Sequence, residues 1–188
     1  MQIEIKKLQR LTGVTTVMVT HDQEEALAMA DRVAVMSRGR IEHFGTPTEV
    51  YDRPATLFAS RFVGTTNLFP GTVVRLSAKE AEIKLDCGPT IIATSVDLLP
   101  ATRRSLVSIR PEHFRMEPHA GDGAIATTVR VVMPLGPTVF YELETDDGLG
   151  IKLTQPREER NVSPALGTRV FLKPATSSAC RAYKEPSE

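Results

Sequence analysis

The chain has 188 residues, and its 23 lysines and arginines balance its 23 aspartates and glutamates, so the formal net charge is zero. This balance removes the basic surface that draws proteins to nucleic-acid phosphates, and the absence of tryptophan weakens a base-stacking function. The two cysteines, Cys87 and Cys180, form no CxxC pair, which argues against a disulfide scaffold or a zinc ribbon. No apolar run approaches the roughly 20 residues that span a bilayer, so we expect membrane contact only through a partner.

The N-terminal segment predicts a helix followed by a strand. Ile3, Leu8 and Leu11 recur at roughly helical spacing among charged residues, and Gly13 can end that helix. The run VTTVMVT, residues 14–20, is short and rich in β-branched residues. Such a run is typical of a strand that is buried on both faces of a sheet.

A second helix and a hairpin are predicted next. Asp22 followed by Glu25 is a capping-box pattern, which places the start of a helix there. The strands RVAVM (32–36) and IEHF (41–44) flank a turn at residues 38–39 and predict a β-hairpin.

Two short helices should complete this part of the chain. Thr46 is a predicted N-cap, Pro47 takes the first helical position and Glu49 completes a capping box. The segment ATLFASRFVG (55–64) predicts another helix that ends at Gly64.

The pattern changes from about Leu68, where short β-branched segments alternate with Gly, Pro, Asp and Asn turns. So many short strands predict a second, all-β domain built as a small barrel or a sandwich. The predicted strands are residues 71–76, 80–85, 90–94, 105–110, 126–133, 139–145, 149–154 and 168–173.

His21 is the candidate functional residue of the first domain. It directly follows the strand predicted over residues 14–20, at the end of a sheet where α/β folds place their ligands. Two interpretations stay open on this pattern alone. His21 either contacts a ligand or merely caps the next helix beside Asp22.

The sequence around His21 resembles a known family. VTHDQEEA (19–26) and ADRVAVMSRGRIEHFGTPTEVYDRPA (30–55) are similar to the ATP-binding subunits of bacterial ABC importers, of the branch that serves sugars, polyamines, ferric iron and phosphorus compounds. In that family the histidine of the VTHD segment is a switch residue that contacts the γ-phosphate of ATP and helps to position the attacking water. The resemblance implies this catalytic and ATP-binding role for His21.

The neighbouring residues Asp22, Gln23 and Glu24 fall in the same turn, and we expect only capping and orienting roles for them. The sequence contains no GxxxxGK[ST] phosphate loop, no LSGGQ-like signature and no apolar strand ending in Asp-Glu before His21. Residues 1–64 are therefore expected to be a truncated remnant of an α/β ATPase domain. ATP and magnesium would bind only in the intact parent, and we expect no cofactor and no metal site for this chain alone.

It follows that the purified chain should show no measurable ATPase activity, because hydrolysis requires phosphate-binding groups and a magnesium ligand that these residues do not supply. A coupled assay for magnesium-dependent phosphate release checks this expectation. Turnover that His21→Ala abolishes would contradict it.

A second resemblance covers part of residues 65–188. SIRPEHFRM (108–116) and VRVVMPLGPTVFYELETDDG (129–148) are similar to the TOBE-type regulatory domain of these ATPases, an OB-like β-barrel. Arg110, Pro111 and Glu112 are regulatory candidates. They either contact a ligand, or form a turn in which Pro111 starts a helical bend and Glu112 caps it or pairs with Arg110.

The resemblance implies a C-terminal fragment of an importer subunit that couples ATP hydrolysis to solute uptake at the cytoplasmic face of the inner membrane. Its expected partners are membrane-spanning permease subunits, a second copy of the subunit and, indirectly, a periplasmic solute-binding protein, with no nucleic acid. The sequence does not name the solute. The alternatives are a free-standing oxyanion-binding OB-like module, which predicts an internal repeat, and a single-stranded nucleic-acid binder, which predicts a basic face.

The apolar strands predicted at residues 14–20 and 32–36 carry one further expectation. Without the rest of a sheet they would expose an edge and a wide apolar patch. We therefore expect the isolated chain to self-associate there or to have a loosely ordered N-terminal third.

Overall fold

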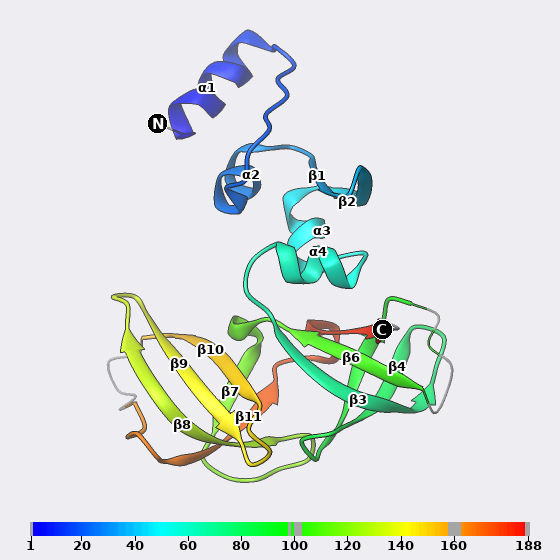
Figure 1. Cartoon of the computed structure of the whole chain (residues 1–188). Helices are drawn as coiled ribbons and strands as arrows, with labels where there is room; N and C mark the ends of the chain where they lie inside the picture. Colours follow the sequence, from blue (N-terminus) through cyan, green and yellow to red (C-terminus); the bar gives the residue numbers. More distant parts are fainter. Residues whose placement is uncertain (1, 98, 100–102, 158–162, 187–188) are drawn as a thin grey trace. The chain divides into compact units, whose positions relative to one another are not determined.

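The computed structural model describes residues 2–97, 99, 103–157 and 163–186, and the chain divides into two compact units (Figure 1). The N-terminal unit is Met1–Gly64 and the C-terminal unit is Thr65–Glu188. Among the described residues, none of the helices combines the length and the apolar character that crossing a bilayer requires.

The first helix of the N-terminal unit, α1 (Gln2–Thr12), is confirmed, and it ends at Gly13 with a positive φ of 65°. The strand predicted over residues 14–20 is wrong, because this stretch is irregular and residues 14–19 are solvent-exposed, Val19 to 96%. A strand needs hydrogen-bonding neighbours, and the described strands of this unit pair only with each other. The β-branched residues favour a strand, but no neighbouring strand is present among the described residues to form the hydrogen bonds that a strand needs.

Helix α2 (Gln23–Met29) follows the irregular stretch and begins where the sequence predicts. Asp22 is its N-cap and accepts a hydrogen bond from the Glu25 amide at 3.0 Å. The predicted capping box is only half correct. The Glu25 carboxylate does not return to the Asp22 amide but accepts a hydrogen bond from the Thr20 hydroxyl at 2.9 Å.

The predicted hairpin is confirmed as β1 (Val33–Ser37) and β2 (Arg40–Gly45). Its two turn residues, Arg38 and Gly39, both have positive φ, as a two-residue turn between twisted antiparallel strands requires. Helices α3 (Pro47–Asp52) and α4 (Leu57–Phe62) come next. The unit has a small core, formed by Val35, Val50, Ala59 and Val63.

The N-cap of α3 gives a first stability prediction. Thr46 and Glu49 form the complete capping box, with the Glu49 carboxylate 2.8 Å from the Thr46 amide. These hydrogen bonds hold the pKa of Glu49 below its ordinary value. We expect Thr46→Ala to destabilise α3 by about 1 kcal/mol and Thr46→Ser to be nearly neutral, since serine keeps the capping oxygen. Hydrogen exchange at the Val50 amide, which donates to the Thr46 carbonyl, measures the effect; equal exchange in the two variants would contradict it.

The C-terminal unit consists of two five-stranded sheets (Figure 1). One sheet is a closed barrel in the order β12-β5-β4-β3-β6, and the other is open with the order β10-β9-β8-β11-β7. In the barrel, β12 pairs in parallel with β5 and antiparallel with β6, which closes it. The strands are β3 (Asn67–Leu76), β4 (Glu80–Leu85), β5 (Thr90–Ser95), β6 (Arg104–Ile109), β7 (Phe114–Glu117), β8 (Ile125–Pro134), β9 (Thr138–Thr145), β10 (Gly150–Pro156), β11 (Arg169–Pro174) and β12 (Cys180–Lys184).

The predicted fold class is confirmed for this part of the chain, which is all β with an OB-like closed barrel. All eight predicted strands are present. The sequence did not predict β7 and β12, which are short and carry two charged residues each.

A single hydrophobic core joins the two sheets. Phe69 and Ile109 of the barrel and Ile125 and Leu153 of the open sheet are fully buried in one cluster. The Phe69 ring meets the Phe114 ring edge to face, with 5.9 Å between the ring centroids. Removing either sheet would therefore expose the apolar face of the other.

A bidentate ion pair on the barrel gives a pH prediction. Arg104 donates to both carboxylate oxygens of Asp86, at 2.7 and 2.8 Å, and these hydrogen bonds hold the pKa of Asp86 below its ordinary value. A carboxyl group whose pKa is lowered in the folded state stabilises the protein at pH values above its ordinary pKa. This stabilisation is lost as the pH falls through the pKa of the folded state. Both side chains are more than 40% exposed, so we expect the ion pair to contribute less than about 1 kcal/mol to the free energy of unfolding.

Urea unfolding at about pH 6 and about pH 3 checks this prediction. Asp86→Asn should have a lower free energy of unfolding than wild type at the higher pH. Its free energy of unfolding should also fall less than that of wild type between the higher and the lower pH. An identical pH dependence in both proteins would contradict the assignment.

Candidate functional site

Hydrogen bonds on both sides of His21 fix the turn that carries it. The Thr20 hydroxyl donates to the Glu25 carboxylate at 2.9 Å and accepts from the Asp22 amide at 3.0 Å. Asp22 in turn accepts from the Glu25 amide. His21 itself is exposed, but it does not follow a strand as predicted, because residues 14–20 form none.

Gln23 attaches the start of α2 to the end of the N-terminal unit. Its side-chain oxygen Oε1 accepts a hydrogen bond from the Gly64 amide at 2.7 Å. The sequence predicted only a capping or orienting role for Gln23. It gave no sign of the partner, because Gly64 is 41 residues away.

A hollow of about 940 Å³ borders this turn within the N-terminal unit. Its wall includes Thr20, His21 and Gln23 together with exposed apolar side chains such as Val17. Its lining includes Lys6, which donates to the Ala28 carbonyl at 3.1 Å, and Arg32, whose guanidinium lies 3.9 Å from the Glu49 carboxylate. Among the residues that the structure describes, no group of His, Cys, Asp and Glu is arranged to bind a metal ion.

The Arg110-Pro111-Glu112 segment lies in the C-terminal unit and forms a turn. Pro111 begins the 3₁₀ helix η1 (Pro111–His113), which is the predicted helical bend. Arg110 is only 4% exposed, and its Nη1 donates to the Thr65 carbonyl at 3.0 Å. Glu112 is exposed. Arg110 is thus engaged with the backbone of its own unit.

Thr66, just before β3, and Asn67, its first residue, make further contacts that the sequence did not predict. The Thr66 and Ser108 hydroxyls are 2.6 Å apart. The Asn67 side chain bridges the two sheets, because its Nδ2 donates to the Lys152 carbonyl at 2.8 Å and its Oδ1 accepts from the Lys152 amide at 2.8 Å. Asn67 thereby pairs with the edge strand β10 as another strand would.

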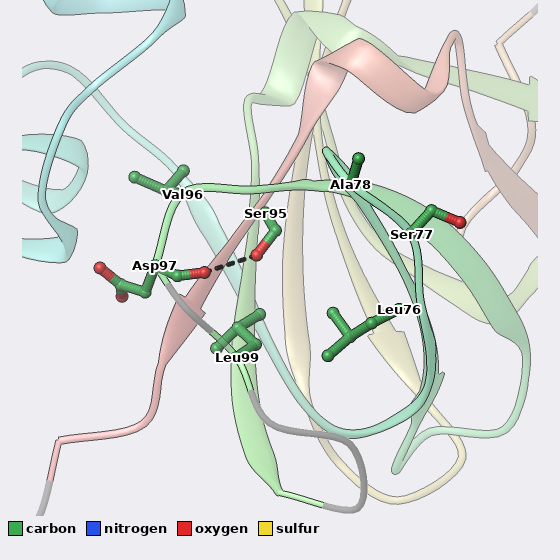
Figure 2. Close-up of a pocket in the computed structure, with 7 residues that line it drawn as sticks. All are labelled: Leu76, Ser77, Ala78, Ser95, Val96, Asp97 and Leu99. Carbon is green, nitrogen blue, oxygen red and sulfur yellow. Dashed lines mark hydrogen bonds between the residues drawn. The ribbon is translucent and has the colours of Figure 1, made fainter.

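A separate hollow of about 450 Å³ lies beside the barrel strands, lined by Leu76, Ser77, Ala78, Ser95, Val96, Asp97 and Leu99 (Figure 2). Figure 2 shows the Ser95 hydroxyl directed to the Asp97 carbonyl, to which it donates at 2.6 Å. The Asp97 carboxylate accepts from the Lys184 amide. A carboxylate repels an oxyanion, and the Ser95 hydroxyl already has a partner, so this hollow gives no support to an oxyanion site.

The two cysteines are poor nucleophiles because they are partly or fully buried. Burial raises the pKa of Cys87 to about 11 and that of Cys180 to about 12. Both are therefore thiols at neutral pH, and thiols do not attack as thiolates do. His43 has a local role, since its Nδ1 accepts from the Ala55 amide at 3.1 Å.

Comparisons with known proteins found a family model and relatives that match this chain. The family model of the TOBE domain matches residues 107–180. The chain is 40% identical over 167 residues to the "Spermidine/putrescine import ATP-binding protein PotA" of Nostoc sp., covering 86% of this chain and 44% of that protein. It is 43% identical over 158 residues to the "Fe(3+) ions import ATP-binding protein FbpC 2" of Rhizobium meliloti, covering 82% and 38%.

Among solved structures, the chain is similar to the cytoplasmic molybdate-binding protein ModG in a crystal form with molybdate bound. The TM-score is 0.53 at 17% identity, over 63% of this chain and 96% of ModG. At this identity the likeness supports the fold alone and no ligand. The chain spans less than half the length of the curated relatives named above.

Proposed function

We propose that this chain, which carries a TOBE domain and is related to the ATP-binding subunits of ABC importers, serves in a subunit that couples ATP binding and hydrolysis to solute uptake. In this proposal His21 is the switch histidine that contacts the γ-phosphate, and the C-terminal unit is the regulatory and dimerisation domain. The observation that carries the proposal is an exposed His21 on a turn fixed by Thr20, Asp22 and Glu25, in a chain that matches importer ATP-binding proteins.

The described residues supply only part of an ATPase site. Phosphoryl transfer requires a lysine and backbone amides around the phosphates, a magnesium ligand and a group that orients water. Here an imidazole stands beside carboxylates that already serve the turn, so these residues do not fit a magnesium ion. The proposed contribution of this chain is therefore one oriented hydrogen-bonding group, and the remaining groups would come from other residues of an intact ATPase.

The same proposal assigns the partners. These are membrane-spanning permease subunits, a second copy of the ATP-binding subunit and, indirectly, a periplasmic solute-binding protein, at the cytoplasmic face of a bacterial inner membrane. The relatives' names differ in their solutes, spermidine and putrescine in one and Fe(3+) ions in the other. The proposal is accordingly confined to an importer subunit without a named solute.

A chimera tests this function. The segment of the Nostoc spermidine/putrescine import ATP-binding protein that matches this chain is replaced by residues 1–188, and magnesium-dependent ATPase activity is measured. We expect turnover within about tenfold of the unmodified relative, since each half would supply its own groups to one site. A folded, nucleotide-binding chimera without turnover would contradict the proposal.

A further inference from the structure

The segment between α1 and α2 has unpaired backbone groups. Within the part of the chain that the structure describes, the backbone of residues 15–19 takes part in no hydrogen bond. The flanking residues differ from these five. The Val14 carbonyl accepts from the Gln9 side chain at 2.9 Å, and the Thr20 hydroxyl belongs to the turn of His21. Five consecutive residues therefore present free donors and acceptors, as the edge of a sheet does.

This segment also has the exposure pattern of a strand. Figure 1 shows an extended connection from α1 to α2, and none of residues 14–20 has a positive φ. The exposed fraction alternates along it, with 87% at Val17, 40% at Met18 and 96% at Val19. A period of two is that of a β-strand, so Val17 and Val19 lie on one solvent-facing side. Pairing with another strand would require little rearrangement of this backbone.

A second copy of the same segment is the partner that its composition fits. Residues 14–20, VTTVMVT, contain no charged residue, proline or glycine, which is typical of segments that pair with their own copies. When a charged strand meets its own copy, like charges can face each other and oppose the pairing. This segment has no such charges. The described strands of its own unit, β1 and β2, pair only with each other.

The charges on either side of the segment favour the antiparallel direction. A basic residue lies before it, because Arg10 is exposed in the last turn of α1. Acidic residues lie after it, because Asp22 and Glu24 are exposed at the start of α2. In an antiparallel pair the basic flank of each copy lies beside the acidic flank of the other, whereas a parallel pair would bring like charges together.

We propose that two copies of this chain dimerise by pairing residues 15–19 antiparallel, with Val17 opposite Val17 on a two-fold axis. This register uses all five free residues. It places Thr15 opposite Val19 and keeps the solvent-facing sides of both strands together, where every cross-strand pair consists of β-branched residues. The same surface serves both copies, as a two-fold interface requires.

Sedimentation equilibrium on the full 188-residue chain tests the dimer. We expect a monomer–dimer equilibrium in which the dimer fraction rises with concentration, and hydrogen exchange at alternate amides of residues 15–19 should slow with it. Val17→Asp should lower the association constant at least about tenfold at neutral pH, because it places two carboxylates opposite each other. Val17→Thr should keep the dimer, because threonine is β-branched and uncharged.

The matched control for the charged substitution is Ile41→Asp. Ile41 is another exposed apolar residue of the N-terminal unit, 61% exposed on β2, but it lies outside the segment. Its substitution should leave the association constant unchanged. Exchange protection of the Val50 amide, which donates to the Thr46 carbonyl, verifies that the unit is folded in each variant.

Cysteine cross-linking tests the register. Opposite residues of an antiparallel pair have Cα atoms about 4.5 to 5.5 Å apart, which a disulfide can span. Val17→Cys should therefore cross-link to itself under mild oxidation. Val19→Cys should not, because the two copies of this position are four residues apart along the strands, about 14 Å. A mixture of Thr15→Cys and Val19→Cys should cross-link again.

The proposal is overturned if the chain stays monomeric at every concentration, or if Val17→Asp self-associates as strongly as wild type. Cross-linking of Val19→Cys to itself as efficiently as Val17→Cys would also overturn it, because the register would then be absent. The dimer does not depend on a role of His21 in ATP hydrolysis, so a chimera without turnover would leave these results unchanged.

Discussion

His21→Ala in the ATPase chimera should lower kcat by about 10²- to 10³-fold, the usual cost of removing one preorganised hydrogen-bonding group from charge that develops in a transition state. Hydrogen bonds through Thr20 and Asp22 hold the turn on both sides of His21, so the backbone that carries the imidazole is fixed before a ligand arrives. We expect KM for ATP to change much less, because the phosphates and the nucleoside would be bound mainly by the relative's half of the chimera. Steady-state kinetics with magnesium and ATP measure both constants.

The matched control for this substitution is His119→Ala. His119 is also exposed, but it lies in the C-terminal unit outside the turn. The substitution His119→Ala should leave kcat within about twofold of the unsubstituted chimera, since surface substitutions away from special contacts are close to neutral. Equal kcat values for the two alanine variants would show that His21 does not contribute to the reaction. Unchanged hydrogen exchange at the Glu25 amide would show that the turn is still folded in His21→Ala.

Asn67→Ala should lower the free energy of unfolding of the C-terminal unit by roughly 2 to 3 kcal/mol. Asn67 is 5% exposed, and its amide group satisfies both the amide and the carbonyl of Lys152 on the edge strand β10. Alanine leaves these backbone groups, and the Ile109 carbonyl that Nδ2 also contacts at 3.3 Å, without their partner. Urea unfolding followed by tyrosine fluorescence, to which the buried Tyr141 and Tyr183 of this unit contribute, measures the loss.

Asn67→Asp separates hydrogen bonding from packing at the same site. Its shape is nearly that of asparagine, and it can still accept from the Lys152 amide, but it has no Nδ2 donor for the Lys152 and Ile109 carbonyls. We therefore expect a loss comparable to that of alanine at neutral pH, since a buried carboxylate facing carbonyl oxygens is unfavourable. Wild-type stability of both variants would show that the bridge does not hold the sheets together.

The features that the sequence predicted well are those that nearby residues determine. The Thr46 and Glu49 capping box, the turn at Arg38 and Gly39 and the N-cap at Asp22 depend on groups three or fewer positions apart, and all are present. Eight strands were found for the same reason, since alternation along one segment already indicates its buried face.

Apart from the half-formed capping box at Asp22 and Glu25, the failures involve groups that lie far apart in the chain. Residues 14–20 have strand composition but no neighbouring strand among the described residues, and composition alone does not provide one. The partners of Gln23, Arg110 and Asn67 are 41, 45 and 85 residues away, and no local pattern indicates them. Self-association through the exposed apolar surface of the N-terminal unit stays a prediction.

The closure of the barrel by β12 has a consequence for biosynthesis. Strands β3 to β6 are translated early, yet β5 and β6 acquire their shared neighbour only when residues 180–184 have left the ribosome. Until then both strands present unpaired backbone edges, which are sites of mispairing between nascent chains. This unit can therefore become resistant to proteolysis only after β12 has been translated. A pause of the ribosome before that point would lengthen the time for which chaperones can bind the unpaired strands.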